Sequence, residues 1–181
     1  AYVKAAESKA ETGEWTEAIN AYKSAISCGI DIDDCAGGFV EAVIRGVENE
    51  RHIDNWNPQD AISRLELALD TGHRTEEVKT ALCACYVHLC RLQADDEEFD
   101  DASASIEQAL SYRPDDQEAR SAAAVTHFGA ALSALRDGEL DRAIDHLHSA
   151  LVFDDGSNAR RAISDLFFKI ELWVSAIEFF R

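Results

Sequence analysis

Four stretches of the chain repeat one pattern at nearly constant spacing, and this repetition constrains the fold more than any other feature. The aligned stretches are GEWTEAINAYKSAI (13–26), WNPQDAISRLELAL (56–69), EEFDDASASIEQAL (97–110) and GELDRAIDHLHSAL (138–151). Their starts lie 43, 41 and 41 residues apart, and each stretch has alanine at its sixth and thirteenth positions. A fixed period of this length indicates similar structural units that stack on their neighbours.

Within each stretch the apolar residues follow the spacing of an amphipathic helix. In the first stretch Trp15, Ala18, Ile19 and Tyr22 obey the i, i+3, i+4, i+7 rule. A second helical pattern precedes each stretch, and the alanines allow another helix to approach closely. We therefore expect antiparallel helix pairs, each of which buries its apolar face only against the next pair.

These patterns predict an all-α fold of four helix pairs followed by a C-terminal helix. The pairs are expected at about residues 1–28, 34–71, 75–112 and 116–154, all within the repeat region 1–157, and the apolar C-terminal helix at 158–181. Asp33 or Asp34 is the expected cap of the helix that opens the second pair. No long glycine- or serine-rich stretch occurs, so no flexible linker is expected.

The first stretch resembles the second helix of the tetratricopeptide repeat (TPR) family. It has Gly13, the aromatic residues Trp15 and Tyr22, and alanine at the expected places, and Pro114 stands at an expected repeat end. The family repeat has about 34 residues, so the longer spacing here indicates a long-repeat or divergent variant in which the first helix of each pair is extended. Pro58 also stands where the family has an aromatic residue. The resemblance implies a right-handed α-solenoid.

The resemblance also implies a protein-interaction scaffold with no catalysis of its own. In this family the first helices line a concave groove that receives peptides or helices. The positions that the resemblance places in the groove are Val43, Val47, Val87, Arg91, Phe128, Leu132 and Arg136. The alternative is that these apolar residues are buried against neighbouring helices. Val3 and Glu7 occupy the places of the family's carboxylate clamp, which favours an apolar or amphipathic helix as the guest.

The stretch CACYVHLC, residues 83–90, could hold a metal or provide packing thiols. Cys83 and Cys85 point to different sides of a helix, and Cys83 and Cys90 are about 10 Å apart along it. If Glu97 takes the turn position of Gly13 and Gly138, Cys90 falls on the small-residue site that Gly46 and Ala131 fill in other repeats. We therefore expect packing cysteines, which behave as small hydrophobic residues.

Other sequence features exclude several classes of function. A net charge of −18 repels nucleic acid and anionic membranes, and no stretch is long enough to span a membrane. His146 and His148 lie on opposite sides of their helix and cannot bind one metal together. No phosphate loop or catalytic motif occurs, so neither a cofactor nor an enzyme is expected. Five unevenly spaced cysteines and no signal peptide predict a cytoplasmic protein.

The apolar C-terminal segment is expected to form an interface. Its predicted contact residues are Phe167, Ile170, Trp173, Ile177 and Phe180. So large an apolar surface is expected to be buried against another surface. It could be buried by a further repeat of a longer parent chain, by a second copy of this chain, by a partner protein, or by the chain's own groove. The alternative to a scaffold is a regulatory or sensor module of a larger protein that responds to a ligand or metal.

Overall fold

A computed structural model describes residues 1–53, 56–153, 164–166 and 168–170. Helices account for all the regular structure of these residues, and no strand occurs among them. The elements are α1 (Tyr2–Glu11), α2 (Trp15–Ser27), a short 3₁₀ helix η1 (Ile32–Asp34), α3 (Ala36–Glu50), α4 (Pro58–Asp70), α5 (Thr75–Asp95), α6 (Phe99–Tyr112), α7 (Gln117–Asp137) and α8 (Leu140–Phe153). The predicted all-α fold is confirmed.

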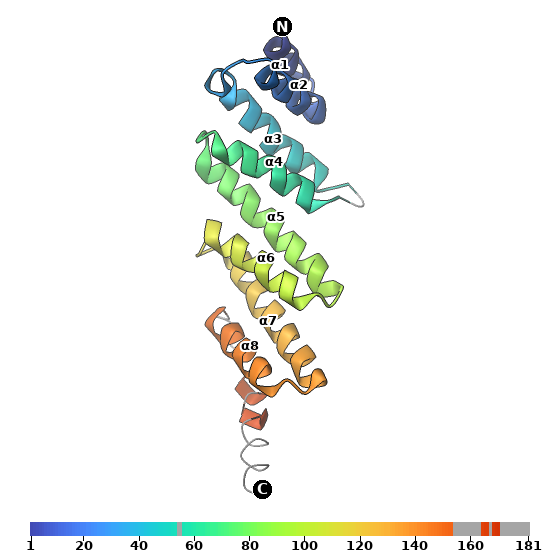
Figure 1. Cartoon of the computed structure of the whole chain (residues 1–181), viewed down its shortest axis with the longest axis vertical. Coiled ribbons are helices and arrows are strands. Elements are labelled where there is room, and N and C mark those ends of the chain that lie inside the picture. Colours follow the sequence, from blue (N-terminus) through green and yellow to red (C-terminus); the bar gives the residue numbers. More distant parts are fainter. Residues whose placement is uncertain (54–55, 154–163, 167, 171–181) are drawn as a thin grey trace, which may run out of the picture. The chain divides into compact units, whose positions relative to one another are not determined.

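The chain forms two compact units, unit 1 from Ala1 to Cys85 and unit 2 from Tyr86 to Arg181. The boundary falls inside α5 and not in a linker. In unit 1, α1 packs on α2, α2 on α3 and α3 on α4, and in unit 2, α6 packs on α7 and α7 on α8. Figure 1 shows α1 and α2 of unit 1, and α7 and α8 of unit 2, as antiparallel hairpins.

The first helices of the later pairs are the long ones. Helices α5 and α7 contain 21 residues each, whereas α6 and α8 contain 14. The prediction that the longer repeat period extends the first helix is therefore confirmed for these two pairs. The extra turns lengthen the face that each first helix offers to its neighbours.

Three turns between paired helices share one backbone conformation. Gly13, Glu97 and Gly138 have φ angles of 78°, 62° and 80°, which is the left-handed region that commonly ends a helix. In each turn the next residue donates its N–H to the carbonyl oxygen five positions back, at 2.8 or 2.9 Å. This shared geometry confirms the alignment in which Glu97 takes the place of a glycine.

In unit 1, glycines of α3 make room for large side chains of α2. A Cβ at Gly38 would overlap the hydroxyl of Tyr22, whose ring meets Phe39 edge-on at a centroid distance of 6.3 Å. A Cβ at Gly46 would lie 3.3 Å from both Ile19 and Trp15. The repeating aromatic and small positions therefore pack helix α2 against the first helix of the following pair.

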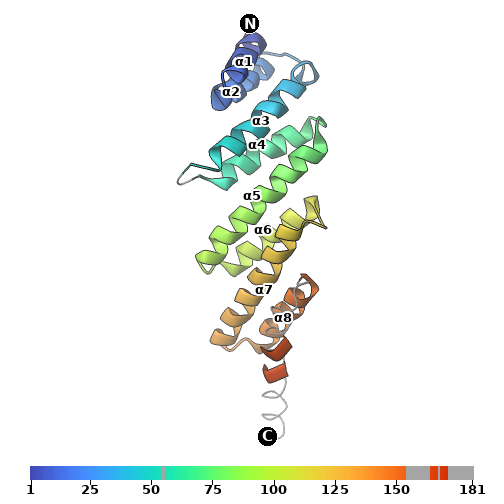
Figure 2. The same cartoon turned by 180° about the vertical axis from the view of Figure 1, so that it is seen from behind.

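Unit 2 repeats this packing between α6 and α7. The ring of Phe99 lies over Gly129, where an added Cβ would be 2.5 Å from Cε1 of the ring. Helices α7 and α8 lie side by side (Figure 2), and a further core between them includes residues beyond α8. Its buried members are Ala131, Leu147, Ala150 and Ile170.

The helix starts follow local hydrogen bonding. Asn57 and Asp116 cap α4 and α7, because their side chains accept the N–H of Gln59 and Ala119 at 3.0 Å. The expectation that Asp33 or Asp34 caps α3 is wrong. Both lie in η1, and α3 begins one residue after Cys35, which makes no side-chain cap.

Candidate functional site

A groove lies between α3 and α5 on the described part of unit 1. It encloses about 280 Å³. Its apolar floor consists of Ile44, Val47 and the small residues Ala81 and Ala84. The complete lining is Ile44, Val47, Glu48, Arg51, Glu77, Thr80, Ala81 and Ala84. The groove thus combines an apolar floor with a rim that carries both signs of charge.

Unit 2 contains a second groove of the same kind, between α5 and α7. It encloses about 170 Å³ and is lined by Arg91, Ala94, Asp95, Ser121, Ala122, Val125 and Thr126. Val125 is 69% exposed and gives this groove an apolar contact that faces solvent. At the rim, Arg91 Nη1 lies 2.9 Å from a carboxylate oxygen of Glu118.

The two grooves occupy equivalent positions in successive repeats. A shift of 41 residues carries Thr80 to Ser121, Ala81 to Ala122 and Ala84 to Val125, so one wall of each groove has the same pattern. The same shift carries the rim carboxylate of Glu77 to that of Glu118. Successive repeats therefore share a groove wall on the surface as well as packing positions in the core. These two grooves are our candidate site.

The structure places the predicted groove residues in three environments. Val43, Val47 and Val87 are buried, with at most 2% of their surface exposed, and of these only Val47 lines a groove. Arg91, Leu132 and Arg136 are exposed, and Phe128 is half-buried. For Val43 and Val87 the alternative of burial against neighbouring helices therefore describes the structure.

Sequence reasoning missed the residues that line the opposite walls. Thr80, Ala84, Ser121 and Val125 lie on the face of α5 or α7 that turns toward the preceding first helix. A signal for them exists in the chain, because small and apolar residues recur there with the 41-residue period. The prediction instead followed the register of the family resemblance, which places Val43 and Val87 in the groove although both are buried in the core.

Ion pairs fix several charged side chains at the edges of unit 2. Besides the pair of Arg91 and Glu118, Arg136 donates to Glu97 at 3.0 Å, and this hydrogen bond raises the pKa of Arg136. Exposed pairs of this kind contribute little to stability, because water and salt screen the charges. In unit 1, Arg51 forms no ion pair with any residue that the structure describes.

The cysteines of CACYVHLC are packing residues, as predicted. Cys83, Cys85 and Cys90 are at most 2% exposed. Burial raises the pKa of the Cys85 thiol to about 12, so this thiol stays protonated and unreactive at neutral pH. Cys90 lies 3.1 Å from Oγ1 of Thr126 on α7. In the described ranges no three potential metal ligands come together.

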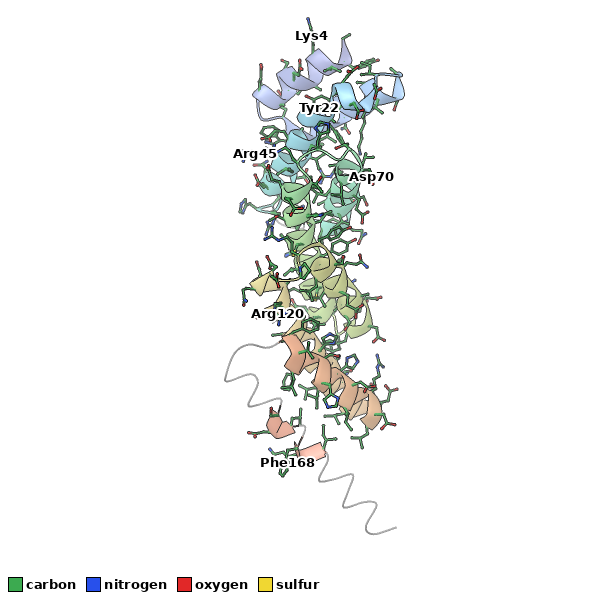
Figure 3. All side chains as sticks on the ribbon, turned by 90° about the vertical axis from the view of Figure 1, so that its left-hand side faces the viewer. Lys4, Tyr22, Arg45, Asp70, Arg120 and Phe168 are labelled. Atoms are coloured by element: carbon green, nitrogen blue, oxygen red, sulfur yellow. The ribbon has the colours of Figure 1, made fainter. Side chains whose placement is uncertain are left out.

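The structure describes only part of the predicted C-terminal interface. Ile170 is 6% exposed and belongs to the core between α7 and α8, whereas Phe168 is 63% exposed (Figure 3). Phe167, Trp173, Ile177 and Phe180 lie outside the described residues. The interface as a whole stays a prediction, although Ile170 itself packs within its own unit.

The comparisons with known proteins bear on the fold. No protein-family model and no curated protein sequence matches the chain. Among solved structures, the chain is similar to a TPR repeats protein from Bacteroides fragilis NCTC 9343, with 13% identity and a TM-score of 0.52 over 95% of this chain and 81% of that chain. None of the described helices has the length and apolar character needed to cross a bilayer. The predicted TPR-like, all-α fold is thereby confirmed.

Proposed function

We propose that the chain is a protein-interaction scaffold without catalysis of its own, and that its grooves bind an amphipathic helix of a partner protein. The observation that carries this proposal is the recurrence of one groove design in two successive repeats. Core packing alone does not require that the exposed residues Thr80 and Ser121, or Glu77 and Glu118, recur one repeat apart.

The chemistry of the grooves favours a helical guest. Their walls carry the small side chains Ala81, Ala84 and Ala122, which let a helix backbone approach closely, and Val125 offers an exposed apolar contact. A helix that presents an apolar stripe to such a floor is a recurring mode of recognition. Because the chain has a net charge of −18, basic residues beside the stripe would speed association.

A displayed library of helical peptides, selected on the full chain, tests the proposal. We expect the selected peptides to share an apolar stripe flanked by lysine or arginine, and to bind with affinities measurable by fluorescence anisotropy. Val125→Asp should weaken binding at least tenfold, because it places a carboxylate on the apolar contact. Ala84→Arg should weaken it by filling the groove of unit 1.

Val152→Asp is the matched control. Val152 is also 69% exposed but lies on α8 and lines neither groove. The same charge change at the same exposure should leave peptide affinity unchanged, and circular dichroism should show equal helix content in all three variants. The proposal is wrong if no helical peptide binds, or if Val125→Asp and Ala84→Arg bind the selected peptides as tightly as the wild type does.

A further inference from the structure

Two histidines on adjacent helices of unit 2 meet through their ring nitrogens. His127 on α7 and His146 on α8 have their Nδ1 atoms 3.4 Å apart and their ring centroids 5.6 Å apart. The centroid distance exceeds the Nδ1–Nδ1 distance by about two ring radii. The two Nδ1 atoms therefore lie close to the line that joins the ring centres, and the rings meet edge to edge. In the neutral pair one Nδ1–H donates to the other, unprotonated Nδ1.

The pair lies near the middle of α7 and of α8, and contacts beside it fasten the C-terminal end of α8 to α7. The ring of Phe153 stacks on His127 with centroids 5.8 Å apart and an interplanar angle of 10°. Arg120, labelled in Figure 3, lies 6.0 Å from the centre of the Phe153 ring and donates to the carbonyl of Val152 at 3.2 Å. The contact thus joins the first turns of α7 to the last turn of α8.

Both imidazoles are neutral at pH 7. Burial, and secondarily the neighbouring His146, lowers the pKa of His127 to about 4. Burial also lowers the pKa of His146, and Arg142 on α8 adds to this effect. Two carboxylates oppose it, Asp145 on α8 and Asp100 on α6, and Asp100 is itself paired with Arg142.

We propose that the pair His127–His146 is an acid-sensitive latch that holds the C-terminal half of α8 against α7. The hydrogen bond needs one unprotonated Nδ1. When both imidazoles carry two protons, two N–H donors face each other and two positive charges share a partly buried contact. The stacked Phe153 then loses its partner, and α8 opens from its C-terminal end.

The direction of the pH effect follows from proton linkage. An exposed histidine in the open state has a pKa of about 6.5, above the value of about 4 that His127 has in the closed state. The open state therefore binds more protons between these values, and the closed state is favoured less as pH falls through this window. For His127 alone, the opening equilibrium should increase roughly 20-fold between pH 7 and pH 5.

Amide hydrogen exchange of the full chain, corrected for intrinsic rates, measures this opening. We expect protection of peptides from α8, residues 140–153, to fall at least tenfold between pH 7 and pH 5. Peptides from α2, residues 15–27, should keep their protection, because the latch acts within unit 2. Equal losses in both helices at the same pH would show general acid unfolding and overturn the proposal.

A double variant, His127→Phe with His146→Leu, removes both titrating groups and keeps an apolar contact with Phe153. Its α8 protection should be the same at pH 7 and pH 5, whereas His148→Gln, which removes an exposed imidazole from the same helix, should behave as the wild type. If the double variant retains the pH-dependent loss, the latch does not exist.

Proton NMR of the wild type tests the latch without any substitution. The Cε1–H signals of His127 and His146 should shift only at pH values below the usual titration range of an exposed histidine, whose pKa is about 6.5. Ordinary titration of both signals near pH 6.5, with α8 still protected, would equally refute the proposal.

Discussion

Substitution of Gly129 by alanine tests whether close packing of α6 on α7 sets the geometry of unit 2. The added Cβ would lie 2.5 Å from Cε1, 3.0 Å from Cζ and 3.3 Å from Cδ1 of the Phe99 ring. These atoms belong to one rigid ring, so the ring must move as a whole or α6 must shift. Neither movement is small in a packed interior.

Two opposing terms set the magnitude of the effect. Alanine is more favourable than glycine inside a helix by about 1 kcal/mol. Forcing a methyl group into a filled site costs typically about 1–3 kcal/mol. Because the overlap involves several ring atoms, we expect the packing cost to lie in the upper part of this range, at about 2–3 kcal/mol. After the helix term is subtracted, the free energy of unfolding should fall by about 1–2 kcal/mol.

Urea unfolding followed by circular dichroism at 222 nm measures this change, and two further variants isolate its cause. Gly37→Ala on α3 meets nothing within 4 Å, so it should leave stability unchanged or raise it. In a Phe99→Leu background, where the ring is absent, Gly129→Ala should become stabilising. Our packing argument fails if Gly129→Ala stabilises the wild type as much as Gly37→Ala does.

Three further predictions concern stability and thiol access. Asn57→Ala should lower the free energy of unfolding by about 1 kcal/mol through loss of the α4 cap, whereas Asn57→Asp should retain it; equal losses in urea titrations would exclude capping. Arg64 binds both carboxylate oxygens of Glu50 with side chains only 16% and 21% exposed, so Glu50→Gln should cost about 1–2 kcal/mol, and an unchanged urea midpoint would contradict this. A thiol reagent should modify Cys28 rapidly and the other four cysteines, all buried, only after denaturant is added; fast modification of more than one thiol in the native chain would show that the core of CACYVHLC opens.

The repeat period was enough to predict the helix pairs and their packing residues. Alanine and glycine recur at positions where two helices touch, and the structure shows Gly46, Cys90 and Ala131 buried as equivalent small residues. The turn at Glu97 could be aligned because a left-handed residue must occur at that point in each pair. These features are local or periodic, so a single sequence records them directly.

The groove and the histidine pair could not be predicted in the same way. The side of a first helix that faces solvent depends on the rotation of the helix about its own axis, and the neighbouring helices set that rotation. A single sequence does not record it, so the prediction places Val43 and Val87 in the groove although both are buried. His127 and His146 are 19 residues apart on different helices. The sequence pattern tested only partners on the same helix, such as His148, and so it missed this contact.

The shared left-handed turn at Glu97 and Gly138 makes the chain divisible into interchangeable cassettes. A segment from Glu98 to Gly138 starts just after one left-handed turn residue and ends at the next. It contains the whole of α6, the second helix of one pair, and the whole of α7, the first helix of the next pair. Duplicating this segment in frame would add one more wall of the type formed by Ser121, Ala122 and Val125. Arrays with a chosen number of grooves could therefore be assembled from this chain at the level of the gene, without redesign of any interface.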